Sequence, residues 1–182
     1  YGVSACATCD GFFFKNKKVF VVGGGDSAME EAIFLTKFAS TVTIIHRKDK
    51  FRASKIMQDK ALNNQKIDVL WNLSVIDMVG EPEDGGLKSI IVHNNKTDLK
   101  SEIVCDGLFL GIGHNPNSNI FKNKIELDEK GYIITKDKST QTSVEGVFAA
   151  GDIMDPVYRQ AVTAAGTGCM AALDAEKYLE SL

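Results

Sequence analysis

One segment constrains the fold of this chain more than any other: a short apolar run that breaks into glycines and continues as a helical pattern. The run spans residues 18–22, and residues 23–25 are all glycine. This order is typical of a buried parallel strand that enters a tight turn. Ser27 and Glu30 have the spacing of a helix capping box. With a further strand predicted at residues 41–45, the segment forms one βαβ unit.

Gly23, Gly25 and Ala28 have the spacing of the dinucleotide-binding fingerprint. The first glycine permits the tight turn, the second lets the backbone approach a pyrophosphate, and the small third residue allows close packing of helix on strand. Asp26 and Ser27 lie at the predicted helix N-terminus, where phosphates bind. A glycine-rich turn without a ligand is the alternative, and the flanking strand and helix favour the cofactor site.

A basic cluster follows the second strand of this unit. His46, Arg47 and Lys48 are consecutive, and Arg52 comes four residues later. An NAD site places a carboxylate near this position to bind the ribose, whereas cations there match the 2′-phosphate of NADPH. The cluster therefore predicts NADPH as the cofactor. A solvated basic loop is the alternative.

The remaining elements of residues 1–113 complete an α/β domain. They are a helix at 53–63, a strand at 67–71, three short strands at 73–79, 87–92 and 99–104 separated by turn signals, and a buried strand at 108–112. The prediction is a Rossmann-like domain whose parallel sheet is joined by an antiparallel β-meander.

A cluster of Gly, Asn and Pro after residue 112 marks a domain boundary at Gly113. The predicted elements of residues 114–182 are strands at 132–135 and 147–150 and a long helix from about 158 to 182. This is a thin core for an independent domain. We therefore expect residues 114–182 to be part of a larger domain.

Cys6 and Cys9 form a C-x-x-C pair followed by Asp10. Two thiols at this spacing can close a small redox-active disulfide, and the carboxyl group could move protons to a leaving thiolate. The alternatives are a zinc site, a chance pair of buried cysteines, and a structural cap for Asp10. Because no second paired motif supplies further ligands, no metal site is predicted. Cys105 and Cys169 are expected to be inert core residues.

The composition excludes several partners. The chain of 182 residues has a formal net charge of −3, its basic residues form no stripe, and no apolar run approaches the roughly 18 residues that span a bilayer. Neither nucleic acid nor a membrane is expected as a partner.

Several motifs together resemble the low-molecular-weight thioredoxin reductases. They are Ser4 to Gly11 around the cysteine pair, Gly23 to Ala28, His46 to Arg52, Gly113 to Pro116, Gly146 to Asp152, and Tyr158 to Ala161. Other pyridine nucleotide-disulfide flavoproteins share single motifs, but a redox pair combined with the His-Arg cluster in one NADPH domain is specific to these reductases. A relative that reduces peroxiredoxins is similar around the pair but lacks the cationic cluster.

The resemblance implies an NADPH-dependent flavoenzyme that reduces thioredoxin through FAD and the dithiol. It implies that Cys9 faces the flavin, Cys6 attacks thioredoxin and Asp10 is the acid/base. It further implies FAD contacts from residues 114–182 and a hinge near Gly113. The implied FAD contacts are Asp152 at the ribityl-phosphate portion and Arg159, Gln160 and Ala161 along the isoalloxazine ring. A homodimer, in the cytoplasm or alternatively a mitochondrion, is expected for the complete enzyme.

Two features depart from the family pattern. Lys48 replaces the usual second arginine and offers a point charge instead of a planar fork. In addition, only one dinucleotide fingerprint is present, so residues 114–182 are expected to be the C-terminal portion of a Rossmann-like FAD domain. The alternative function is thus an NADPH-binding fragment without turnover.

Overall fold

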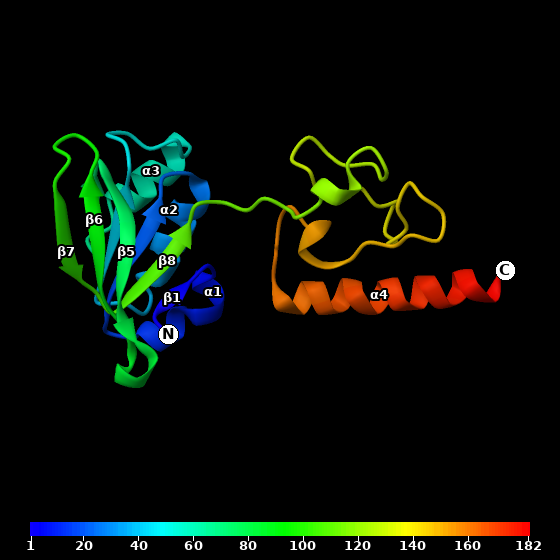
Figure 1. Cartoon of the computed structure of the whole chain (residues 1–182), viewed down its shortest axis with the longest axis horizontal. Helices are drawn as coiled ribbons and strands as arrows, with labels where there is room; N and C mark the ends of the chain where they lie inside the picture. Colours follow the sequence, from blue (N-terminus) through cyan, green and yellow to red (C-terminus); the bar gives the residue numbers. More distant parts are fainter. The chain divides into compact units, whose positions relative to one another are not determined.

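The computed structural model describes residues 1–182, which form two compact units. Unit 1 is Tyr1–Gly113 and unit 2 is His114–Leu182 (Figure 1).

Unit 1 is built on a five-stranded parallel sheet with the strand order β1-β8-β2-β3-β4. The strands are β1 (Val3–Ser4), β2 (Lys18–Gly23), β3 (Thr41–His46), β4 (Ile67–Trp71) and β8 (Gly107–Gly111). Most residues of β2, β3 and β8 are buried, as expected for parallel strands covered on both faces. The predicted α/β class is confirmed.

Alternate residues of the central strands build two separate cores. Val19 and Val21 of β2 pack with the helices α1 (Ala7–Asp10), α2 (Asp26–Leu35) and α3 (Lys55–Leu62). Phe20, on the opposite face, packs with Ile90 of the antiparallel sheet. Since side chains alternate along a strand, the parallel sheet becomes the middle of three layers (Figure 1).

The predicted meander is confirmed as a three-stranded antiparallel sheet between β4 and β8. Its strands are β5 (Leu73–Glu81), β6 (Gly86–Asn94) and β7 (Lys100–Val104), paired in that order. The β5–β6 turn ends at Gly85, whose φ of 89° lies in the left-handed region that glycine adopts without strain. The meander thus covers the sheet face that lacks helices.

Unit 2 contains one long helix, α4 (Ala161–Glu180), and two short 3₁₀ turns, η3 (Asn119–Phe121) and η4 (Gly151–Ile153). The predicted strands at 132–135 and 147–150 are wrong, because these segments make only isolated bridges, Leu127 with Ile133 and Gln141 with Phe148. A strand needs a continuous ladder of backbone partners. Unit 2 supplies such partners at single residues only.

Helix α4 confirms the predicted long helix, although it begins three residues later than expected. None of its residues is buried within the described chain. The prediction that Cys169 is a core residue is therefore wrong, since its thiol is exposed, whereas Cys105 is buried as expected. No helix here combines the length and apolar character needed to cross a membrane.

Candidate dinucleotide and disulfide sites

The turn between β2 and α2 requires glycine at position 23. The φ of Gly23 is +157°, and a Cβ atom there would lie 2.3 Å from the carbonyl oxygen of Gly111 and 2.6 Å from the Cβ of Ala28. Ala28 is fully buried. The first and third fingerprint positions are therefore fixed by the close approach of β8 and α2 to the turn.

At position 25, by contrast, packing within the chain does not require glycine. A Cβ atom at this position would meet nothing within 4 Å. Gly25 is the N-cap of α2 and makes no side-chain cap, so no capping side chain occupies the N-terminal end of this helix. This is the arrangement that a helix offers to a phosphate.

The predicted capping box of Ser27 and Glu30 is wrong. Helix α2 begins at Asp26, with Gly25 as its N-cap, so Ser27 already lies inside the first turn. A capping box needs the hydroxyl residue at the N-cap itself.

Two sets of hydrogen bonds attach the basic loop to the glycine turn. The amides of Arg52 and Ala53 donate to the carbonyl oxygen of Gly24 at 2.7 and 3.0 Å. The amide and hydroxyl of Ser54 donate to Oδ1 of Asp26 at 2.8 and 2.9 Å. Asp26 thus supports the basic loop, and its predicted cofactor contact stays a prediction.

His46 is also part of this support. Its side chain is buried, and a Cβ atom on Gly24 would lie 2.3 Å from its Cε1. Nε2 pairs with the carbonyl oxygen of Lys50 at 3.0 Å, and the ring contacts Phe51 and Trp71. The imidazole therefore packs between the glycine turn and the loop that carries the arginines, and contacts both.

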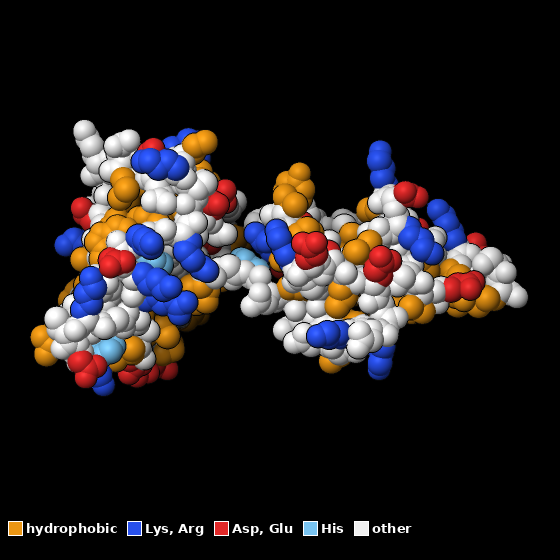
Figure 2. All heavy atoms as spheres, turned by 90° about the horizontal axis from the view of Figure 1, so that it is seen from above, with side chains coloured by type: hydrophobic (Ala, Val, Ile, Leu, Met, Phe, Trp, Pro, Cys, Tyr) orange, Lys and Arg blue, Asp and Glu red, His pale blue; other side chains and the backbone are white.

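A cavity of about 500 Å³ opens above these elements. Its lining includes Gly23 to Gly25, Ser27, His46, Arg47, Arg52, Gly111 to Gly113, and Leu73 to Val75. Lys and Arg side chains gather on unit 1 in Figure 2. The exposed Lys48 does not line the cavity. The wall formed by Leu73 to Val75 was missed, because no local pattern indicates where a meander strand will lie relative to the glycine turn.

Cys6 and Cys9 are joined by a disulfide bond at the start of α1. Cys6 is the N-cap, and its Sγ accepts a hydrogen bond from the amide of Cys9 at 3.2 Å. Asp10, the last residue of α1, accepts a hydrogen bond from the hydroxyl of Ser4 at 2.7 Å on Oδ2. The predicted dithiol and its acid/base therefore lie in one short segment.

In unit 2, Asp155 organises the residues that precede α4. Its carboxylate accepts hydrogen bonds from the amides of Val157, Tyr158 and Arg159 at 2.8 to 2.9 Å. Partial burial raises the pKa of this carboxyl, but these amides and the hydroxyl of Thr163 outweigh burial, so the pKa is lowered overall. Sequence reasoning missed Asp155, although Asp before Pro is a common turn signal.

The same turn positions the predicted flavin-contacting residues. Arg159 has a φ of 50°, and Gln160 is the N-cap of α4, with Ala161 as the first helical residue. A cavity of about 290 Å³ within unit 2 is lined by residues that include Asp152, Arg159 and Tyr132. The structure thus brings Asp152 and Arg159 to one cavity.

The family described as pyridine nucleotide-disulphide oxidoreductase matches residues 1–168. The chain belongs to this family. It is 56% identical to a thioredoxin reductase of Rickettsia conorii, over 98% of this chain and 58% of the relative. It is 58% identical to the mitochondrial thioredoxin reductase 1 of Arabidopsis thaliana, over 100% of this chain and 49% of the relative.

Solved structures of the family agree. The thioredoxin reductase of Streptococcus pyogenes superposes with a TM-score of 0.90 at 43% identity, over 100% of this chain and 58% of that chain. The resemblance inferred from the motifs is confirmed. The chain spans about half to three fifths of the length of these relatives.

Glu31 of α2 is expected to make the stability of this chain depend on pH. Its Oε2 is buried without a hydrogen-bond partner, close to Gly111. Burial, aided by the charge of Glu30, raises the pKa of Glu31 from 4.5 to about 7. Between these values the unfolded chain has released a proton that the folded chain retains. The free energy of unfolding therefore falls as the pH rises through this window.

We expect Glu31→Gln to remove this loss. Relative to the unmodified chain, the variant should gain about 1–2 kcal/mol in the free energy of unfolding at pH 8, less than the full shift implies because the side chain is partly solvated. The two proteins should converge at pH 4. Urea unfolding at both pH values measures the difference. A gain of equal size at both pH values would show that the charge of Glu31 is not its cause.

Proposed function

We propose that this chain carries the NADPH-binding and dithiol-bearing parts of a thioredoxin-disulfide reductase, and that unit 2 contributes part of its FAD site. One observation carries the proposal: the cavity at the glycine turn and the Cys6–Cys9 disulfide belong to the same folded unit. A dinucleotide site together with a redox disulfide fits electron transfer from a nicotinamide to a protein thiol.

The cavity favours NADPH over NADH. Arg47 and Arg52 line it, and its lining includes no Asp or Glu. The carbonyl oxygen of Arg47 accepts a hydrogen bond from the side chain of Asn95 at 3.0 Å, which holds this loop against the meander. Guanidinium groups suit a dianionic 2′-phosphate, whereas the ribose hydroxyls of NADH call for a carboxylate acceptor.

The dithiol reaction balances without another reactant. The Cys6 thiolate attacks the disulfide of thioredoxin, and Asp10 relays a proton from the Cys9 thiol to the thiolate that leaves. The Cys9 thiolate then attacks the Cys6 sulfur of the mixed disulfide and releases the second thiol of thioredoxin. Two electrons move from this chain to its partner, and the Cys6–Cys9 bond forms again.

Unit 2 fits a portion of FAD. The exposed carboxylate of Asp152 and the side chain of Arg159 line one cavity, and the turn held by Asp155 leads into the N-terminus of a 20-residue helix. Bound FAD supplies the two-electron carrier that accepts hydride from NADPH and reduces a disulfide.

Visible spectroscopy tests the proposal. The purified chain is mixed with FAD, freed of unbound flavin and treated with NADPH, and the chemically reduced chain is mixed with oxidised thioredoxin. A retained flavin band that NADPH bleaches supports the whole proposal. A colourless chain that binds NADPH and reduces thioredoxin only after chemical reduction supports the NADPH and dithiol parts and contradicts the FAD part. Failure to bind NADPH overturns the proposal, and faster reduction of a peroxiredoxin would reassign the partner.

Arg47→Ala is expected to weaken NADPH binding about 10- to 100-fold, because a charged hydrogen bond contributes roughly 1.5–3 kcal/mol. Binding of NADH should change by less than about threefold, since NADH lacks the 2′-phosphate. Lys48→Ala is the comparison variant, because Lys48 lies outside the cavity lining. Calorimetric titration with both nucleotides measures the effect. Equal weakening for the two nucleotides would argue that Arg47 supports the fold of the loop instead of binding phosphate.

A further inference from the structure

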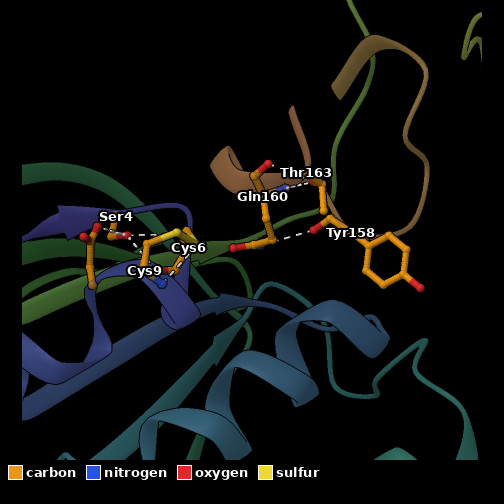
Figure 3. The surroundings of a disulfide bond; sticks show 7 residues. Ser4, Cys6, Cys9, Tyr158, Gln160 and Thr163 are labelled. Atoms are coloured by element: carbon orange, nitrogen blue, oxygen red, sulfur yellow. Dashed lines mark hydrogen bonds between the residues drawn. A yellow bond between two sulfur atoms is a disulfide. The ribbon is translucent and has the colours of Figure 1, made fainter. Parts of the chain in front are cut away.

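We infer that Ser4 is a positioning residue that aims the carboxyl group of Asp10 at the reacting sulfurs, an inference that rests on the proposed dithiol chemistry. The side chain of Ser4 is almost fully buried. Its hydroxyl donates to Oδ2 of Asp10 at 2.7 Å and accepts from the amide of Cys6 at 3.0 Å (Figure 3). One hydroxyl therefore joins the proton carrier to the backbone of the attacking cysteine.

The hydroxyl has a single proton, so its two acceptors compete. The carbonyl oxygen of Cys6 lies 3.3 Å from the Ser4 oxygen, and the carboxylate of Asp10 lies 2.7 Å away. An O–H···O hydrogen bond is strongest at about 2.7 Å and is weak beyond about 3 Å. The proton of Ser4 is thus directed to Asp10.

Ser4 is itself fixed by the parallel sheet. It lies in β1, which pairs with β8 so that Ser4 is opposite Phe109. Helix α1 has four residues, too few to hold its own geometry in water. The contact with Ser4 connects this short helix to the parallel sheet through β1, and general acid catalysis depends on such placement within hydrogen-bond reach.

The inference predicts a selective defect in Ser4→Ala. When the leaving thiolate is alkyl, it is basic and needs a proton, which passes from the Cys9 thiol through Asp10 to the leaving sulfur. When the leaving thiolate is aromatic and activated, it departs without a proton. We expect the variant to react about 10-fold more slowly with 2-hydroxyethyl disulfide and within about twofold of the unmodified rate with an activated aromatic disulfide.

Stopped-flow measurement of the chemically reduced chain with each disulfide tests this, and it requires neither nucleotide, flavin nor thioredoxin. Failure of the proposed function therefore remains distinguishable from failure of this inference. Ser4→Thr, which keeps a hydroxyl, should restore the rate. In an Asp10→Asn chain, Ser4→Ala should cause no further loss, because coupled residues are not additive. Equal slowing with both disulfides, or additive losses in the double variant, would overturn the inference.

Discussion

Gly23→Ala is expected to abolish measurable NADPH binding and to lower the free energy of unfolding by about 2–4 kcal/mol, the sum of backbone strain and overpacking. The added Cβ would lie 2.3 Å from a backbone oxygen of β8, at a φ of +157°. Neither β8 nor the buried Ala28 can retreat without disturbing the core, so the turn itself must change. Calorimetric titration with NADPH and urea unfolding measure the two effects.

Gly25→Ala is the matched control. Its backbone has a φ of −99°, and the added Cβ meets no protein atom within 4 Å. The stability of the chain should stay within about 0.5 kcal/mol of the original. NADPH binding should nevertheless fall about 10-fold, because the methyl group occupies space that the pyrophosphate requires. If Gly23→Ala retained both stability and binding, the packing argument for the first fingerprint position would be wrong.

The fold of unit 1 was predictable because its signals are local. The apolar run of β2, the three glycines and the small Ala28 follow one another within eleven positions, and all fit the same strand-turn-helix geometry. The antiparallel meander was predictable for a similar reason, since each turn contains residues that favour left-handed or tight backbone conformations. A fold can be predicted from sequence where the local preferences of the residues agree with the global fold.

The supporting residues of the site could not be predicted in the same way. Asp26 is hydrogen-bonded to Ser54, 28 positions away, and Ser4, in the edge strand β1, is hydrogen-bonded to Asp10 of α1. The sequence places Asp26 beside the glycines and predicts a cofactor contact, but it gives no sign of the hydrogen bond to Ser54. A side chain whose role depends on tertiary contacts gives no periodic signal.

In unit 2, a local pattern predicted a strand that does not form. Val147 to Ala150 has the apolar character of a strand, yet its Phe148 forms only one isolated bridge. Strand propensity describes a side chain that fits a half-buried pleated surface, so an apolar run becomes a strand only where neighbouring strands provide that surface. Cys169 is exposed for a similar reason. The small residues along α4 suit close packing against a neighbouring element, but no residue of α4 is buried in this chain.

Cys6→Ser and Cys9→Ser are each expected to reduce the rate of complete two-electron reduction of thioredoxin to below about 1% of the original, because a single thiol cannot complete disulfide exchange. NADPH binding should be unchanged in both variants, since neither cysteine lines the nucleotide cavity. The assay mixes the chemically reduced chain with oxidised thioredoxin, and a nucleotide titration is the control. Complete reduction of thioredoxin by either variant at the original rate would contradict the assignment of this pair as the redox dithiol.

The two variants should differ in the product they accumulate. In Cys9→Ser, the backbone amide of residue 9 can still donate to the Cys6 sulfur, a hydrogen bond of 3.2 Å in the present structure that stabilises the attacking thiolate. Cys6 then joins thioredoxin in a mixed disulfide that no second thiol can resolve, and mass spectrometry of the non-reduced mixture should detect it within minutes. In Cys6→Ser this adduct should form far more slowly. A faster adduct in Cys6→Ser would exchange the roles of the two cysteines and make Cys9 the thiol that attacks thioredoxin.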